Sequence, residues 1–282
     1  MTSPTWKSRN LPEPMPFGVV GWALALCRGL VLGLIVFGGL GILLLTRLVE
    51  RPLHGLHRPW TPRITVFVCR AAFLVLGLPI RHQGAPMASP GVIVANHSTW
   101  LDIFALNSGG ALYFVSKAEV ARWPGIGWLA RATGTVFVNR DRREAKAQKI
   151  TFEERLTAGH HLLLFPEGTS SDGQRILPFK PTLFAAVFSP ELPGLSVQPV
   201  SVVYHPPEGC EPRHYGWWGD MDFGPHLLQI LATRPQGRVV VIWHPPLAVA
   251  EYPDRKALAA EAEARVRAGH PMGLADPVDQ AG

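Results

Sequence analysis

Hydrophobic residues fill one long segment near the start of the chain. From Val19 to Leu45 nearly every position is apolar, and Arg28 is the one charged residue. The uninterrupted part, 29–45, falls just short of the ~20 residues that a spanning helix needs, and adding 19–26 makes it long enough. Arg28 would then extend its charge to the membrane interface on its apolar stem. The segment is too long for a secretory signal peptide and no small-residue cleavage site follows it, so a membrane-associated helix is predicted.

A second apolar segment, 64–78, contains Arg70 and is too short to span a bilayer alone. Two arrangements are open for it: it lies in the membrane interface, or it pairs with the first segment as a re-entrant hairpin. The link between the two segments is basic, which indicates a cytoplasmic link; its arginines are Arg47, Arg51, Arg58 and Arg63. The N-terminal flank is basic as well, so the sequence leaves open whether the first segment spans the membrane.

The pattern changes after these segments. Residues 1–17 are polar and rich in proline, and we expect them to be disordered; residues 18–84 are the membrane-associated helices and their basic link. In the remaining part, 85–282, short apolar runs alternate with helical stretches. Strands are expected at 91–95, 111–115, 135–138, 161–165, 197–204 and 238–243, and helices after Asp102, between 142 and 156, and between 253 and 268.

This alternation predicts an α/β fold with a largely parallel sheet flanked by helices and an N-terminal membrane-associated helical segment. Functional groups in such sheets gather beyond the carboxyl ends of the strands. The polar segment that follows the first strand is 96–102, N-H-S-T-W-L-D. Asp102 would accept a proton from one nitrogen of His97, so that the other nitrogen can act as a general base toward a hydroxyl.

Three more segments follow in order: 134–140 (G-T-V-F-V-N-R), 165–171 (F-P-E-G-T-S-S) and 197–200 (V-Q-P-V). With 96–102, they make the chain resemble the glycerolipid acyltransferase family, whose bacterial prototype is 1-acyl-glycerol-3-phosphate acyltransferase. That family is marked by an N-H-x4-D block, a G-x-[IV]-F-[IV]-x-R block, an F-P-E-G-T block and a proline-bearing strand. The resemblance covers about residues 85 to 245, so we expect 85–282 to be a catalytic acyltransferase domain.

The resemblance implies a reaction and a set of site residues. A lysolipid hydroxyl would attack an acyl thioester, with His97 taking the proton and Asp102 holding His97; backbone amides at the helix start would stabilise the oxyanion. Arg140 would contact the anionic head group of the acceptor, and Glu167 with Gly168 would position its glycerol-like part. The candidate substrate-binding residues are Asn96, Arg140, Glu167, Gly168, Thr169, Ser170 and Arg175.

One departure from the family pattern bears on the acceptor. Where the family has E-G-T-R, with an arginine that contacts phosphate, this chain has Ser170. Arg175 lies five residues further on, close enough in sequence to replace that arginine. The main expectation is therefore 1-acyl-glycerol-3-phosphate as acceptor, giving phosphatidic acid. The alternative is lyso-ornithine lipid, which carries no phosphate; a second alternative is a non-catalytic lipid-binding protein on the same fold.

Composition bears on location and partners. Charged residues make up 17% of the chain and the net charge is +6, which favours an anionic lipid surface over nucleic acid, because the basic residues form no recognisable nucleic-acid module. The three cysteines have no metal-binding spacing, and we expect no disulfide and no metal. We expect no cofactor apart from the co-substrate, acyl-carrier protein or coenzyme A thioester, and a bacterial inner-membrane location with the catalytic domain in the cytoplasm.

Overall fold

The computed structural model describes residues 6, 12, 16–89, 91–139, 143 and 145–271. The prediction of a disordered N-terminus over 1–17 falls largely outside these residues. The strands are β1 (Ile80–Gln83), β2 (Gly91–Ala95), β3 (Tyr113–Lys117), β4 (Val136–Val138), β5 (Leu162–Leu164), β6 (Ser196–His205), β7 (Arg238–Trp243) and β8 (Leu247–Ala248). The α-helices are α1 (Val19–His54), α2 (Thr61–Leu76), α3 (Leu101–Gly109), α4 (Ile126–Thr133), α5 (Ala145–Thr157), α6 (Phe223–Ala232) and α7 (Arg255–Ala268).

These strands form one sheet in the order β1-β7-β6-β2-β5-β3-β4, with β8 paired to β6. Strands β2 to β6 run parallel to one another, whereas β7 is antiparallel to β6 and carries β1 parallel to itself. The predicted α/β class and largely parallel sheet are confirmed. Strand β1 reads I-R-H-Q, without an apolar run, and so was not expected; it brings the sheet to residue 80, ahead of position 85.

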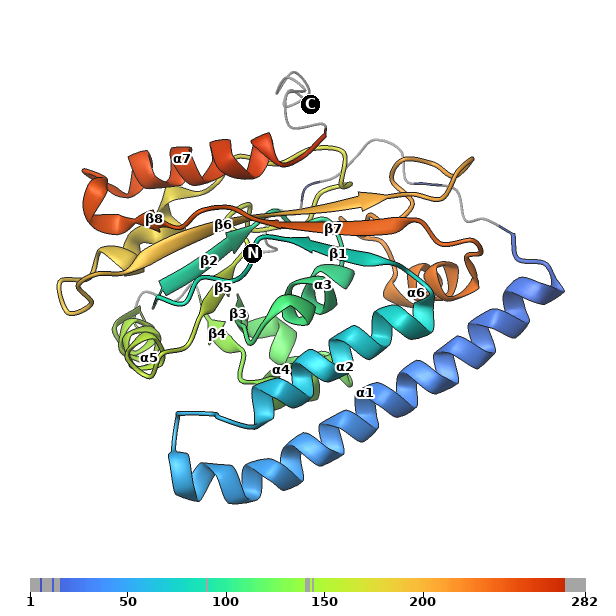
Figure 1. The fold of residues 1–282 in the computed structure, drawn as a ribbon, viewed down its shortest axis with the longest axis horizontal. Coiled ribbons are helices and arrows are strands. Elements are labelled where there is room, and N and C mark those ends of the chain that lie inside the picture. Colours follow the sequence, from blue (N-terminus) through green and yellow to red (C-terminus); the bar gives the residue numbers. More distant parts are fainter. Residues whose placement is uncertain are drawn as a thin grey trace.

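Helices cover both faces of the sheet (Figure 1). Helix α7 lies on one face, and α3 and α6 lie on the other, between the sheet and the α1–α2 pair. Strand β2 shows how the sequence builds this arrangement, because all five of its residues are buried. Ile93 and Ala95 pack in the hydrophobic core between the sheet and helices α3 and α6. Val92 and Val94 pack in the core on the other face, which includes residues of α7. A strand with a helix layer on each side needs apolar residues at every position.

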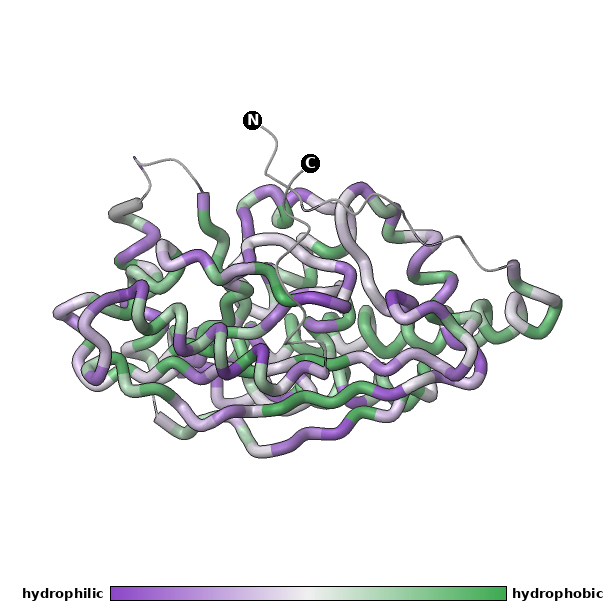
Figure 2. Tube along the Cα trace, turned by 90° about the horizontal axis from the view of Figure 1, so that it is seen from above, coloured by the Kyte–Doolittle hydropathy of each residue, from purple (hydrophilic) through white to green (hydrophobic). Residues whose placement is uncertain are grey.

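Helices α1 and α2 lie side by side as an antiparallel hairpin against the domain (Figure 1). Helix α1 is long and apolar enough to cross a membrane by length and composition. Its first turns project beyond the rest of the molecule and carry mainly hydrophobic positions (Figures 1 and 2), with Val19, Val20 and Trp22 more than half exposed. Of the two arrangements left open for the second segment, the structure shows the pairing with the first. The exposed apolar surface of α1 indicates association with a membrane.

Arg28 forms hydrogen bonds with the catalytic part of the chain. Its guanidinium Nη1 donates to the carbonyl oxygens of Leu231 at 3.0 Å and Thr233 at 2.8 Å, at the end of α6. Arg28 is thus engaged by the protein itself, and its expected place at a membrane interface stays a prediction. These two bonds fasten α1 to the catalytic part, because they satisfy carbonyl groups that the last turn of a helix leaves without partners. Helix α1 is thereby held along the domain at this point.

Glu50 holds the turn of the hairpin. Its buried carboxylate accepts hydrogen bonds from the backbone N–H groups of Trp60 and Thr61, from the Thr61 hydroxyl and from the Arg47 guanidinium. The N-terminus of α2 thus receives its cap from a residue of α1, a substitute for the usual side chain at the cap position itself. This cap ties the end of α1 to the start of α2 at the turn of the hairpin.

Candidate active site

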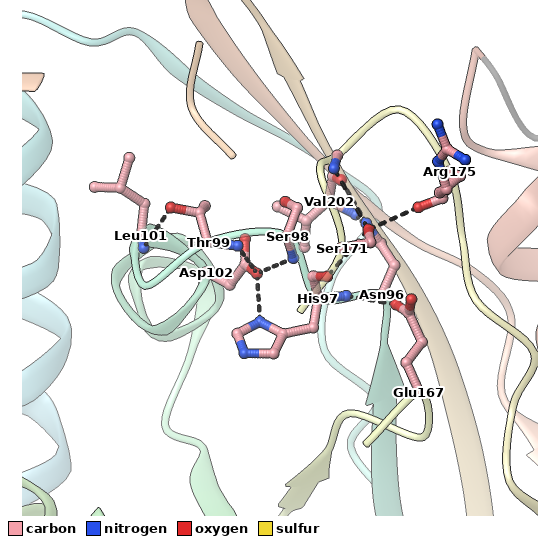
Figure 3. A network of polar contacts seen from close by, with 11 residues as sticks. Asn96, His97, Ser98, Thr99, Leu101, Asp102, Glu167, Ser171, Arg175 and Val202 are labelled. Atoms are coloured by element: carbon pink, nitrogen blue, oxygen red, sulfur yellow. Dashed lines mark hydrogen bonds and ion pairs between the residues drawn. The ribbon is translucent and has the colours of Figure 1, made fainter. Parts of the chain in front are cut away.

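His97 stands just beyond the carboxyl end of β2, where the chain turns into α3. Its Nδ1 lies 2.8 Å from Oδ2 of Asp102, a fully buried residue in the first turn of α3 (Figure 3). The same oxygen accepts the backbone N–H groups of Ser98 at 2.8 Å and Thr99 at 3.1 Å. The chain between the two residues therefore wraps around the carboxylate, which explains why a separation of five positions brings acid and base together.

The His97 ring is fixed by two contacts. It stacks on Phe165 with ring centroids 4.0 Å apart and planes 14° from parallel, and its Nδ1 is bonded to Asp102. Nε2 then points away from the carboxylate (Figure 3), and within the described part of the chain no hydrogen bond occupies it. The side chain is 22% exposed. His97 is thus a partly accessible base whose tautomer and orientation are both set.

Three of the backbone amides between β2 and α3 are engaged with buried carboxyl groups. The backbone N–H of His97 donates to Glu167 Oε1 at 2.7 Å, and those of Ser98 and Thr99 donate to Asp102. These three amides, which precede α3, therefore cannot stabilise the oxyanion. The reason is that a buried carboxylate needs donors of its own, and here the nearest backbone groups supply them. The expectation for the first amides of the helix itself stays a prediction.

Glu167 connects the F-P-E-G loop to the catalytic block. Its carboxylate is 1% exposed, and its two oxygens accept the backbone N–H groups of His97 and Leu177, each at 2.7 Å. Burial raises the pKa of Glu167 to about 8, an effect that the two backbone donors oppose and that the nearby Asp102 adds to. The structure thus gives Glu167 a direct positioning contact with His97; its expected contact with the acceptor stays a prediction.

Replacing Glu167 tests this positioning role. A glutamine offers one acceptor oxygen, so one of the two backbone N–H groups loses its partner, at a cost of about 1–3 kcal/mol. We expect Glu167→Gln to lower the midpoint of thermal unfolding and to reduce acyl transfer by roughly 10- to 100-fold, since a misplaced base transfers protons poorly. Both would be measured on detergent-purified protein, with Glu208→Gln, an exposed glutamate, as the matched control. Wild-type stability in Glu167→Gln would contradict the assignment.

The other residues of the predicted set are placed as follows. The Asn96 amide makes two hydrogen bonds with the backbone of Val202, at 2.8 and 2.9 Å, and so ties the end of β2 to β6. Gly168 has φ +73°, and a Cβ there would meet Lys180 Nζ at 2.6 Å, so the turn requires glycine. Thr169 and Ser170 are half-buried in the same loop. Arg140 lies outside the described residues.

Arg175 does not reach toward His97. Its guanidinium is paired with the buried Asp172 carboxylate, at 3.3 Å from each oxygen, and lies 5.1 Å from the centre of the Trp6 ring. Figure 3 shows it directed away from the imidazole, while its carbonyl oxygen accepts the Ser171 hydroxyl at 2.8 Å. Arg175 therefore stabilises its own loop in this arrangement, and its expected contact with the acceptor stays a prediction.

Three contacts were not expected from the sequence. Phe165 supplies the stacking surface for His97, Ser171 donates its backbone N–H to the His97 carbonyl at 2.9 Å, and Trp217 donates its backbone N–H to the Ser98 carbonyl at 2.8 Å. Phe165 and Ser171 flank the glutamate of the F-P-E-G-T-S-S segment, so that segment was the available signal. The bond from Trp217 joins residues far apart in the sequence, and no local sequence pattern predicts it.

His226 supports the same block from α6. It is buried, and its Nδ1 accepts the Trp100 indole N–H at 2.9 Å. Burial lowers the pKa of His226 to about 4, with a further contribution from His214, whose own pKa burial lowers to about 4. Both rings are therefore neutral in the folded chain near neutral pH, and protonated His226 could not accept the Trp100 bond at Nδ1.

These two histidines predict acid lability. In the unfolded chain these histidines bind protons below a pKa of about 6.5, whereas in the folded chain they stay neutral down to about pH 4. The free energy of unfolding therefore falls as the pH falls from about 6.5 to about 4. Each group contributes up to roughly 1.4 kcal/mol per pH unit. We expect thermal melts between pH 7 and 4.5 to show a shallower loss for His226→Gln, whose amide oxygen can keep the Trp100 bond. An unchanged slope would contradict this account.

Comparison with known proteins places this geometry in a family. The model of the acyltransferase family matches residues 80–203. The chain is 54% identical over 270 residues to a lyso-ornithine lipid O-acyltransferase of Rhodobacter capsulatus, covering 95% of this chain and 98% of the relative. It is 36% identical over 140 residues to a 1-acyl-sn-glycerol-3-phosphate acyltransferase of Neisseria gonorrhoeae, covering 49% and 53% of the two chains.

The fold has a solved counterpart. The crystal structure of the 1-acyl-sn-glycerophosphate acyltransferase from Thermotoga maritima superposes with a TM-score of 0.63, at 24% identity, over 88% of this chain and 94% of that one. The match extends over most of both chains and so concerns the fold as a whole. With the His97–Asp102 pair, the ordered sequence blocks and these relatives in agreement, the chain belongs to the acyltransferase family.

Proposed function

We propose that this enzyme is a lyso-ornithine lipid O-acyltransferase, which transfers a fatty acyl group from a thioester to the free hydroxyl of lyso-ornithine lipid. The observation that carries the proposal is the 54% identity with the Rhodobacter capsulatus protein over almost the whole of both chains. Relatives from Brucella abortus and Pseudomonas aeruginosa, at 38% and 33% identity, are also lyso-ornithine lipid O-acyltransferases.

The site supports this acceptor in one respect. A phosphate monoester is best held by arginine forks, yet the position that would supply one is Ser170, and Arg175 is engaged with Asp172. Lyso-ornithine lipid carries a carboxylate and an ammonium group in place of a phosphate. It therefore needs fewer fixed cations than 1-acyl-glycerol-3-phosphate does.

The chemistry follows from the His97 geometry. Nε2 of His97 accepts the proton of the acceptor hydroxyl as its oxygen attacks the thioester carbonyl carbon; the new C–O bond forms and the C–S bond breaks. The imidazolium is stabilised by the Asp102 carboxylate 2.8 Å away, and then returns the proton to the departing thiolate. We propose acyl-carrier protein or coenzyme A as the thiol, with no further cofactor and no covalent acyl-enzyme.

We also propose where the enzyme works. The apolar surface of α1 would lie in the bacterial inner membrane, with the catalytic domain in the cytoplasm. The bonds from Arg28 to α6 hold α1 along the catalytic domain. This favours a hairpin that enters the membrane from one side over a helix that crosses it. The acceptor could then move from the bilayer to His97 without leaving the interface.

A cell-based experiment tests the proposed acceptor. The chain would be expressed in bacteria that make lyso-ornithine lipid but lack the enzyme that acylates it, and lipid extracts would be examined by mass spectrometry. We expect mature ornithine lipid with the wild-type chain and none with His97→Ala. A chain that is expressed in the membrane and makes no ornithine lipid would contradict the proposal, whereas rescue of a strain deficient in phosphatidic acid synthesis would favour 1-acyl-glycerol-3-phosphate instead.

A further inference from the structure

The Asp102 carboxylate is satisfied on one side only. Oδ2 receives three donors, from His97, Ser98 and Thr99, whereas Oδ1 is buried and has no hydrogen-bond partner among the described residues. A buried carboxylate oxygen without a donor is costly, because the charge has lost its water. The site therefore needs one more donor on the Oδ1 side.

The Tyr204 hydroxyl is the candidate for this donor. It too is buried, and no hydrogen bond of ordinary geometry engages it among the described residues. Tyr204 lies near the end of β6, two positions beyond Val202, which Asn96 fastens to the end of β2, and it packs against the core that contains Leu101 at the start of α3. Burial raises the pKa of Tyr204 well above its usual value, and the Asp102 charge and a hydrogen-bonding contact with the Asp102 side chain raise it further. This agrees with the two incompletely satisfied groups being neighbours.

We propose that Tyr204 is a positioning residue for the catalytic pair: its hydroxyl donates to Oδ1 of Asp102 and thereby keeps Oδ2 on His97. A phenol is suited to this place because it can donate one hydrogen bond and remains uncharged at neutral pH. The bond would prevent rotation of the carboxylate about its Cβ–Cγ bond, which would otherwise exchange the two oxygens. This inference rests on His97 and Asp102 acting as the base and its partner, and not on the identity of the acceptor.

Several ionisable groups surround Asp102 and bear on the pH dependence of kcat/KM. His97 lies on the β2–α3 turn, Glu167 follows β5 and Tyr204 is on β6; each interacts with the Asp102 carboxylate. Tyr215 lies behind Tyr204, with ring centroids 5.7 Å apart. Removing the Tyr204 hydroxyl would leave more negative charge on the oxygen that faces His97, so the imidazolium would be favoured to a higher pH.

Tyr204→Phe is the direct test, and Tyr215→Phe is its matched control. The Tyr215 hydroxyl accepts the Gly237 N–H and donates to Gln236, so its loss affects the fold without touching Asp102. For Tyr204→Phe we expect kcat to fall about tenfold and the acid limb of kcat/KM against pH to move upward by about half to one pH unit, with whichever lysolipid the wild type acylates. Tyr215→Phe should leave that limb in place. An unchanged rate and limb in Tyr204→Phe would overturn the proposal.

A stability measurement gives an answer that is independent of turnover. Thermal unfolding would be compared for the wild type, Tyr204→Phe, Asp102→Ala and the double variant. The hydroxyl should stabilise the chain when Asp102 is present, by roughly 2–4 °C in the unfolding midpoint, and have no such effect once the carboxylate is gone. Equal shifts in both backgrounds would mean that the hydroxyl does not interact with Asp102, and would overturn the proposal even if the acceptor assignment held.

Discussion

Replacement of His97 by alanine should reduce acyl transfer by roughly 10³-fold, within the 10²- to 10⁴-fold range that general bases contribute. Nε2 of His97 is the nitrogen directed away from Asp102, and no described residue occupies it, so its removal leaves the acceptor hydroxyl without a base. The rest of the site should persist, because the Glu167 and Ser171 contacts use the His97 backbone and not its ring.

This prediction is measured with purified protein in nanodiscs, a radiolabelled acyl thioester and saturating acceptor. His57→Ala, an exposed histidine in the hairpin link, is the matched control and should retain wild-type activity. The melting temperature of His97→Ala should stay within a few degrees of the wild type. If His97→Ala kept a tenth or more of the activity while folding normally, His97 could not be the base.

Replacement of Asp102 by asparagine should have the second largest effect, a fall of roughly 10²- to 10³-fold in kcat. The amide oxygen can still accept the His97, Ser98 and Thr99 donors, so the imidazole keeps its orientation. What disappears is the negative charge that stabilises the imidazolium formed during proton transfer. Because the imidazolium is then disfavoured, the acid limb of kcat/KM should move to lower pH, opposite to the shift expected for Tyr204→Phe.

The Asp102 variant is checked with the same labelled assay, run across pH 5 to 9. Asp254→Asn is a suitable control, since Asp254 is an exposed carboxylate that caps α7 through two backbone N–H groups and lies outside the site. A loss of activity with no movement of the acid limb would indicate that Asp102 acts only through the local fold, and not through its charge.

The parts of this molecule that sequence analysis predicted well depend on local chain geometry. Segment 96–102 closes on itself, so the His97–Asp102 contact follows from a strand, a turn and the first turn of a helix. The strands were recognisable because a sheet covered on both faces needs continuous apolar runs such as β2. Strand β1 has no such run, since its residues are mostly exposed, and it could be found only from its pairing with β7.

The parts that could not be predicted depend on partners far along the chain. Arg28 is bonded to carbonyl groups about 200 positions away, at the end of α6, and a hydropathy pattern cannot show such a contact. Glu50 is nearer to its partners, at Trp60 and Thr61, but its role as the cap of α2 depends on the hairpin closing, which a hydropathy pattern does not show. The sequence also did not show that the backbone amides of His97 and Ser98 are engaged by the buried Glu167 and Asp102 carboxyl groups.

The central claim, acyl transfer by His97 to lyso-ornithine lipid, is tested most directly by measuring kcat/KM for two acceptors with the purified enzyme. Lyso-ornithine lipid and 1-acyl-glycerol-3-phosphate would be presented separately in nanodiscs with the same labelled thioester, and His97→Ala would set the background. We predict a higher kcat/KM for lyso-ornithine lipid, abolished in His97→Ala. A higher kcat/KM for 1-acyl-glycerol-3-phosphate, or transfer to lyso-ornithine lipid that survives in His97→Ala, would contradict the account.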